Sequence, residues 1–334
     1  MNVNVKMRNV GLGVAATFGV YLLVTLVLGI YWSSEPDAFD PMVATAAYAK
    51  KVNQKPVVGY VSTVTGITLT ERLLDKPGGF TANDIFPPGA WLDNMPAFEE
   101  GVVLQLRDFA LVMRNDWSRS QSQSVEDEDL LVVQGQYAID TDSWAFPSAE
   151  GEYDKGAQHL QNYLVRLTDT DATDAQFYAR ADNLAEWLAL VQKRLGALTQ
   201  QLSQSVGKDQ PDIDLAGDPG ARQSTPRPAQ RVQKTPWSHR DDVFYEARGQ
   251  SYALIHLLKA ARVDFKDVLA NKNATVSMTN IIQELEPTQD TIWSPMILNG
   301  DGFGFVANHS LVMAAYLARA NTAIIQLQDL LVRG

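Results

Sequence analysis

The sequence predicts a mainly α protein: a single N-terminal transmembrane helix followed by a helical bundle with long heptad-patterned helices. Three observations support this prediction. Residues 10–30 contain no charged side chain, apolar residues recur later at spacings of three and four, and strand-like alternation is scarce. The chain has 334 residues and no cysteine. Disulfides, thiolate metal sites and a cysteine nucleophile are therefore excluded.

The first predicted element is a membrane anchor over residues 10–32. The uncharged run VGLGVAATFGVYLLVTLVLGI is long enough to cross a hydrocarbon core of about 30 Å as a helix rising about 1.5 Å per residue. Tyr31 and Trp32 follow it, as aromatic residues do at membrane interfaces. A buried helix of a soluble protein is an alternative, which the uncharged length and terminal position disfavour.

The charges around this segment predict its orientation. Lys6 and Arg8 precede it, so we expect residues 1–9 to remain in the cytoplasm and the body of the protein to lie outside. A cleaved signal peptide is the main alternative. Cleavage requires small residues before the cut, whereas the exit sequence GIYWSSEP offers Tyr31 or Trp32 at the critical position.

The part of the chain after the anchor is acidic. All 39 acidic residues follow residue 30, together with 26 of the 28 basic ones, which gives a formal charge of −13. Such a surface repels phosphate backbones, so we expect no nucleic-acid partner. The expected partners are the lipid bilayer, through residues 10–32, and a protein of the cell envelope; the oligomeric state stays open.

Residues 35–205 are predicted to be helical. The clearest apolar seam begins at Phe177 and continues in alternating steps of four and three, as in coiled coils, which predicts a helix over about Asp174–Ser205. Shorter seams predict helices around Phe98–Trp117 and Tyr153–Leu167.

Two segments of this region depart from the helical pattern. The run VSTVTGITL (Val61–Leu69) is rich in β-branched residues and is the one strand-like stretch. Ser118–Asp129 is a polar stretch that we interpret as a surface connection, with a recognition surface for a partner protein as the alternative. Its four acids, Glu126–Asp129, suit the first turn of a following helix.

Residues 206–236 interrupt the helical pattern. They hold five of the 15 prolines and few large apolar residues, so we predict a flexible Pro-rich loop or linker. The region 237–334 is again helical and is expected to pack on 35–205 as one bundle. Its last long helix follows a seam from Val306 onward, with Asn308 as the expected N-cap.

The sequence LNGDGFGFVANHS precedes this last helix and is the most unusual stretch. Glycines allow backbone N–H groups to converge, and a helix N-terminus attracts anions, so the stretch is a candidate contact loop. The alternative is a tight turn whose phenylalanines plug into the core. The candidate residues are Asn299, Gly300, Asp301, Gly302, Phe303, Gly304, Phe305, Asn308 and His309.

No motif in the chain announces catalysis. No HExxH, GxSxG or SxxK pattern is present. We therefore predict no catalytic, cofactor-binding or metal-binding residue and no cofactor. Glu150, Glu152 or Asp301 could act in glycan hydrolysis, but a chain with 39 acids always offers such pairs. The four histidines lack zinc-site spacing: His159, His239, His256 and His309.

Several blocks of the chain together resemble a known family: KPGGF, NDIFPPGAWLDNMPAFEEGV, SRSQSQSVEDEDL, WAFPSAEGEY and MILNGDGFGFVANHSLVMAAYLARAN. This family of uncharacterised bacterial membrane proteins is catalogued as domain of unknown function 2333. The resemblance covers nearly the whole chain after the anchor. It implies a Gram-negative source and an inner-membrane protein facing the periplasm, and it carries over no functional residue.

These observations lead to one functional hypothesis and two alternatives. We expect a non-enzymatic, inner-membrane-anchored periplasmic interaction or scaffold protein in envelope maintenance. The first alternative is a periplasmic hydrolase or lyase acting on peptidoglycan or another envelope polymer, which requires two facing carboxylates in a cleft. The second is a sensor that binds a small ligand in the bundle core.

Overall fold

The computed structural model describes residues 2–119, 125–169, 174–206, 208–211, 230–294, 296–300 and 304–333. Within these ranges the protein is mainly α, as the sequence predicts. The eleven α-helices are α1 (Asn2–Trp32), α2 (Pro41–Val52), α3 (Tyr60–Asp75), α4 (Asn94–Val112), α5 (Glu128–Tyr137), α6 (Ala149–Thr168), α7 (Ala181–Ser203), α8 (Arg240–Asp264), α9 (Lys266–Asn271), α10 (Thr275–Leu285) and α11 (His309–Arg333).

Shorter elements complete this part of the chain. The 3-10 and π turns are η1 (Gly89–Trp91), η2 (Met113–Trp117), η3 (Gln204–Val206), η4 (Trp237–His239) and η5 (Glu286–Gln289). Two short strands, β1 (Lys208–Pro211) and β2 (Gln230–Gln233), pair antiparallel inside the predicted linker. The sequence did not predict this pairing. Residues 212–229, between the strands, lie outside the described residues.

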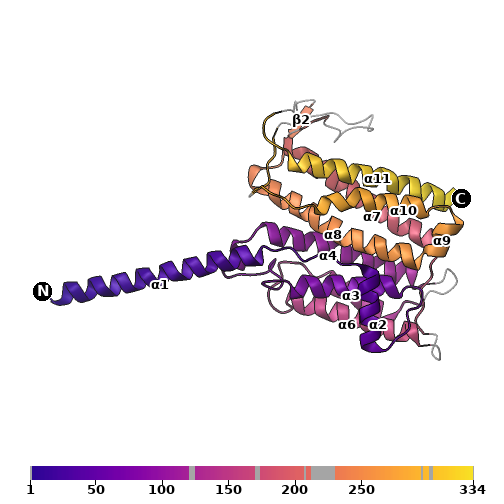
Figure 1. Ribbon diagram of the computed structural model, residues 1–334, viewed down its shortest axis with the longest axis horizontal. Coiled ribbons are helices and arrows are strands. Elements are labelled where there is room, and N and C mark those ends of the chain that lie inside the picture. Colours follow the sequence, from indigo (N-terminus) through magenta and orange to yellow (C-terminus); the bar gives the residue numbers. More distant parts are fainter. Residues whose placement is uncertain are drawn as a thin grey trace, which may run out of the picture.

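Helix α1 projects from the rest of the molecule as a single long rod (Figure 1). Its segment Gly11–Trp32 is long and apolar enough to cross a membrane and is almost entirely exposed, as an anchor or a signal sequence would be. No other helix of the described residues passes the same test. The remaining helices, α2 to α11, form one body with a continuous buried core.

The body has two distinct ends. α4, α8 and α11 all begin at the end that α1 enters, which we call the proximal end (Figure 1). It carries the connections 76–93, 138–148, 234–239 and 290–308. The opposite, distal end carries α9 and the C-terminus of α11 (Figure 1). Four buried aromatic rings and the partly buried ring of Phe177 fill the core toward that end; the buried ones are Phe109, Trp117, Trp187 and Phe265.

Helices on the two sides of the predicted linker pack on each other. α4 and α8 cross at two glycines: a Cβ at Gly101 would lie 2.2 Å from the carbonyl oxygen of Glu246, and one at Gly249 would lie 2.0 Å from that of Phe98. Only glycine permits this backbone approach. α7 pairs with α11, and Gln328 of α11 donates to the carbonyl of Ala185.

The N-terminal boundary predicted for α7 is wrong. The helix begins at Ala181 rather than at Asp174, and Phe177 lies in the preceding extended segment. Tertiary contacts explain the difference. Tyr178 N–H donates to the carbonyl of Trp117 (2.6 Å), and the ring of Phe177 packs against Trp117 and against the backbone at Gly59. These contacts replace the first two helical turns.

The strand-like run Val61–Leu69 is helical, within α3. The threonine hydroxyls that suggested a strand donate instead to carbonyls one turn earlier: Thr63 to Gly59, Thr65 to Val61 and Thr70 to Gly66. The buried carboxylate of Asp264 accepts from Ser62 N–H (2.7 Å) and caps the helix start. Burial and a distant cap thus override the local preference.

The predicted surface connection Ser118–Asp129 lies between α4 and α5, as expected, except that its last two residues, Glu128 and Asp129, belong to α5 and Asp129 is buried. Trp117 ends the π turn that continues α4, and Asp127 caps α5 by accepting from Asp129 N–H and Leu130 N–H. The acids do stand at a helix start. Residues 120–124 lie outside the described residues.

Candidate functional site

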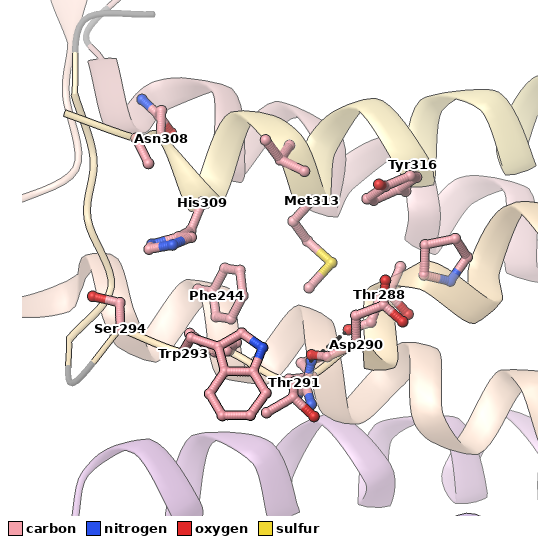
Figure 2. Close-up of a pocket in the computed structure, with 15 residues that line it drawn as sticks. Phe244, Thr288, Asp290, Thr291, Trp293, Ser294, Asn308, His309, Met313 and Tyr316 are labelled. Carbon is pink, nitrogen blue, oxygen red and sulfur yellow. Dashed lines mark hydrogen bonds between the residues drawn. The ribbon is translucent and has the colours of Figure 1, made fainter. Parts of the chain in front are cut away.

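A cavity of about 360 Å³ lies beside the first turns of α11, at the proximal end. Figure 2 shows His309, Met313 and Tyr316 of α11 facing Phe244 of α8 and Trp293 of the preceding connection. The other lining residues are Arg248, Pro287, Thr288, Asp290, Thr291, Ile292, Ser294, Ala307, Asn308 and Val312. Apolar and aromatic surface dominates this wall, as is typical of sites that bind small molecules or protein side chains.

The candidate loop is closed at its neck by a short antiparallel pairing. Gly300 N–H donates to the carbonyl of Ala307, and His309 N–H donates to the carbonyl of Leu298 (2.8 Å). A Cβ at Gly300 would lie 2.1 Å from the carbonyl oxygen of Val306, so this position requires glycine. The neck therefore fixes where the loop leaves α11.

Two predicted residues of this loop have defined roles. Asn308 caps α11, because its Oδ1 accepts from Leu311 N–H (2.8 Å), which confirms the predicted N-cap. Asn299 lies opposite Asn308 in the neck. Of the described residues of the predicted loop, Asn308 and His309 line the cavity and the others do not.

The predicted plugging of Phe305 into the core is wrong: the side chain is fully exposed. Gly304 is also exposed. Asp301, Gly302 and Phe303 lie outside the described residues.

His309 stands at the rim of the cavity. Its Nδ1 accepts from Leu298 N–H (2.8 Å), so the neutral ring carries its proton on Nε2. The ring meets Phe244 edge to face at 6.3 Å between centroids. Burial lowers the pKa of His309, which favours the neutral form. The residue is therefore a neutral hydrogen-bonding group at neutral pH.

Arg248 forms part of the cavity floor and is almost completely buried. Its NH1 donates to the carbonyls of Thr288 (2.7 Å) and Asp290 (2.9 Å), and its NH2 donates to that of Gln289 (3.2 Å). Its Nε donates to the carboxylate of Glu35 (2.7 Å). One guanidinium thus joins the cavity floor to the residues that directly follow α1.

The segment between α1 and α2 is fixed along its length. The carbonyl of Asp37 accepts from Tyr252 OH (2.9 Å) and Arg72 NH1 (2.9 Å). Phe39 N–H donates to Nε2 of His256 (3.0 Å), and the two rings stack at 4.2 Å between centroids. Burial lowers the pKa of His256 to about 4, so the ring stays neutral and keeps this acceptor.

A buried ion pair holds the neighbouring connection. Lys76 Nζ lies 2.7 Å from Glu99 Oε1, and both side chains are fully buried. The same carboxylate accepts from Thr81 N–H and Ala82 N–H. Gly78 of this connection packs against the ring of Trp32, where a Cβ would lie 2.5 Å from Cγ. The end of α1 therefore packs on the connection 76–93, which the buried ion pair and the hydrogen bonds to Glu99 hold in place.

A second cavity, of about 420 Å³, lies next to the candidate loop. Asp93 and Asp241 both line it, with Trp237 and Asn299. Burial, with a contribution from the charge of Asp93, raises the pKa of Asp241. Asp93 Oδ1 accepts from Asn94 N–H at the start of α4. This is a pair of carboxylates in one cavity. Asp93 was not singled out in the sequence, and Asp241 was interpreted only as a residue at the start of a helix.

The other residues considered in the sequence have local partners. Glu150 accepts from Asn83 Nδ2 (2.8 Å), and Glu152 pairs with Lys155. His159 contacts Asp129, and His239 contacts Asp242. In the described part of the chain, no three His, Asp or Glu side chains form a group that could hold a metal ion.

Sequence reasoning found the α11 side of the first cavity but missed Arg248, Trp293 and Tyr316. The sequence around Arg248 predicts an ordinary helix residue, because nothing in it indicates a position beside residues 35 and 290. The signal that could have helped was a tryptophan, Trp293, close to proline and glycine in TIWSPMILNG.

The fold and the site together define a mainly α protein with one apolar N-terminal helix and an apolar cavity beside the junction of that helix with the body. The chain belongs to the family described as "Uncharacterized protein conserved in bacteria (DUF2333)", whose model matches residues 5–334. This membership agrees with the resemblance found in the sequence. No curated protein and no solved structure matches the chain.

Proposed function

We propose that the protein is a non-enzymatic interaction or scaffold subunit of the bacterial envelope that receives a partner protein in the α11 cavity. In this proposal α1 is an uncleaved inner-membrane anchor, residues 1–9 are cytoplasmic and the body is periplasmic. The uncharged span, the bases Lys6 and Arg8 before it and the bacterial family support this placement.

The observation that carries the proposal is the position of Arg248. Because it holds both Glu35 and the carbonyls of residues 288–290, the cavity floor and the exit from α1 are parts of one hydrogen-bonded unit. A segment bound in the cavity would sit at a fixed place relative to the anchor. Such geometry suits a protein that positions a partner at the membrane.

The chemistry of the cavity indicates the kind of segment it would accept. Phe244, Ile292, Trp293, Met313 and Tyr316 offer aromatic, aliphatic and thioether surface. The rim adds the neutral imidazole at position 309 and one carboxylate at position 290. This combination fits an apolar or aromatic side chain flanked by a hydrogen-bonding backbone, the usual anchor of a protein interface.

Site-specific photocrosslinking in cells tests this proposal. A benzophenone amino acid at Val312, on the cavity wall, should give a discrete adduct with an envelope protein. The same group at Ile325, a similarly exposed site further along α11, serves as the control. Trp293→Ala should reduce the adduct from position 312 because it removes part of the wall. Absence of any adduct specific to position 312 would contradict the proposal.

The membrane placement has its own test. A periplasm-active reporter fused to the C-terminus should be active, and the intact chain should stay in the membrane pellet during alkaline carbonate extraction. Release of the chain by carbonate, or a reporter active only in the cytoplasm, would contradict the anchor.

The second cavity supports a second candidate function, a hydrolase or lyase acting on an envelope polymer. Asp93 and Asp241 share that cavity with the exposed ring of Trp237, and the raised pKa of Asp241 suits a general acid. Incubation of the protein with purified sacculi tests this candidate. The candidate function is supported if the wild type releases fragments and Asp241→Asn does not. It is contradicted if the wild type releases no fragments.

A further inference from the structure

The exposed aromatic side chains of the body are confined to one end. Outside α1, every described Phe, Trp or Tyr side chain that is largely exposed lies in a connection of the proximal end, with exposed fractions from 57% to 112%. They are Phe86, Trp91, Trp144, Phe146, Trp237, Trp293 and Phe305. Ile85 and Met296 are exposed in the same connections. Single exposed apolar residues need no explanation, but this concentration does.

The distal end differs in its aromatic residues. It carries exposed valines, such as Val276 in the first turn of α10, but no largely exposed aromatic side chain among the described residues. The aromatic rings nearest to it, including Trp117 and Phe265, are fully buried. The asymmetry between the ends therefore points to something that the proximal end contacts.

The contacts of α1 place one of these connections at a definite depth. A Cβ at Gly29 would lie 3.7 Å from Cβ of Pro88 and 3.9 Å from Cδ2 of Leu92. Gly29 lies within the apolar segment Gly11–Trp32, about 4.5 Å along the helix before Trp32. If α1 spans a bilayer, the connection carrying Phe86 lies beside its last turn, level with the outer interface.

The other aromatic connections are tied to the same end. Asn83 Nδ2 donates to the carbonyl of Ser143 (2.9 Å), so the connection 138–148 lies against the connection 76–93. Arg248 ties residues 288–290 to Glu35, directly after α1. These hydrogen bonds thus hold the connections that carry Trp144, Phe146 and Trp293 close to the exit of α1.

The charges of this end indicate the physical basis of such a contact. Acidic side chains accompany the aromatic ones in the same connections: Asp84, Asp93, Asp140 and Asp142. These charges disfavour adsorption on anionic lipid headgroups. Trp and Phe, by contrast, favour the region between headgroups and acyl chains, where amphipathic and apolar rings insert by about 5–10 Å.

We propose that the proximal end is a second membrane-contact surface, whose aromatic loop tips insert into the interface of the bilayer that α1 spans. The inference rests on the anchoring role of α1 proposed above. The body then stands on the membrane with its long helices rising from it, and both cavities open beside the lipid surface. The surface binds lipid through aromatic insertion and is insensitive to ionic strength.

The absence of native cysteine allows a direct test with the full-length chain in phosphatidylcholine vesicles. Single variants Phe86→Cys and Phe146→Cys report on two separate connections, and Val276→Cys is the matched distal control, since it is 79% exposed. The control site lies beyond the C-terminal end of α8, about 37 Å along that helix from its start. Each cysteine carries an environment-sensitive fluorophore, and the vesicles contain lipid with a headgroup nitroxide.

The expected result is a blue-shifted emission, quenched by the nitroxide lipid, at positions 86 and 146 but not at 276. Added salt should leave both effects unchanged. Flotation of the same vesicles measures independently whether α1 anchors the protein in the bilayer. If the protein floats with the vesicles but the labels at positions 86 and 146 remain exposed to water, the proposed contact surface is contradicted and the anchoring role of α1 is not. Failure to float would overturn both.

Two further outcomes would overturn the lipid contact in favour of other occupants. A blue shift that nitroxide lipid does not quench would mean that protein covers the surface. If that shift grows with the protein-to-lipid ratio, a second copy of this chain is the occupant.

Phe86→Asp should abolish lipid quenching at position 146 or weaken it, because a buried carboxylate opposes insertion of the neighbouring loop.

Discussion

The two ends of the helical body use the same residue types in opposite ways. Toward the distal end, the ring of Trp117 packs on four other rings with centroids 5.0 to 6.0 Å apart: Phe109, Phe177, Trp187 and Phe265. At the proximal end, seven aromatic side chains of the described residues are exposed. Aromatic rings stabilise the fold where they meet one another, and they offer a binding surface where they do not.

The largest effect that would sharpen this comparison is the replacement of one tryptophan at each end. Trp117→Ala removes a buried ring and should lower the free energy of unfolding by about 3 to 5 kcal/mol. Trp293→Ala removes a ring that is 92% exposed and should change it by about 0.5 kcal/mol or less. Denaturant titration of the full chain in detergent micelles measures both. Equal losses would refute the distinction.

His256 provides a pH-dependent test of the contact between α8 and the segment that follows α1. Its folded pKa of about 4 lies below its ordinary value of 6.5, so the unfolded chain takes up a proton first as the pH falls. Its contribution is therefore complete above pH 6.5 and is lost as the pH falls toward 4. The loss should amount to about 3 kcal/mol.

Comparison with His256→Gln isolates this effect, because glutamine does not titrate and can still accept a hydrogen bond from Phe39 N–H. The unfolding free energy of the variant should fall less than that of the wild type between these pH values. His309 also has a lowered pKa and is unchanged in both chains, so its contribution cancels. Parallel pH profiles would contradict the role assigned to His256.

The crossing of α4 and α8 connects the two ends and is sensitive to a single methyl group. Gly101→Ala should destabilise the fold by about 1 to 3 kcal/mol, because the added carbon meets a backbone carbonyl that cannot move alone. Gly135→Ala in α5 is the matched control: nothing lies within 4 Å, so helix propensity should give a gain of about 0.5 to 1 kcal/mol. Thermal or chemical unfolding resolves the opposite signs.

The smallest expected effect concerns the tie between α1 and the cavity. Glu35→Gln replaces a charge-assisted contact with Arg248 by a neutral one and should cost about 1 to 2 kcal/mol, since the glutamate is partly exposed. Asp329→Asn at the exposed pair with Arg333 should cost about 0.5 kcal/mol or less. A loss of the Val312 photocrosslink in Glu35→Gln would further link the anchor to the cavity.

The sequence predicted the amphipathic helices well because their apolar periodicity is a local property. The seams in α4, α6 and α11 all correspond to helices, and Asn308 caps the last one. The prediction from the sequence failed where contacts with distant residues compete with the local conformational preference. Asp264 caps α3 from two hundred residues away, and Trp117 holds Phe177 outside α7.

The candidate site was only partly predictable for the same reason. Glycines and aromatics mark the loop before α11, and Gly300 is required by its close approach to Val306. The alternative in which Phe305 plugs into the core is wrong, because that side chain is fully exposed. The contacts of Arg248, Asp93 and Asp241 could not be predicted, because their neighbours in the fold are far away in the sequence.

The sequence by itself determined the apolar N-terminal helix, the helical class and the acidic charge of the body. These follow from composition and periodicity, which need no knowledge of neighbours. The tertiary structure alone decided which aromatic rings are buried and which face outward, and that Arg248 joins the exit of α1 to the cavity. Burial and hydrogen bonding depend on contacts between distant segments, and only the folded chain brings those segments together.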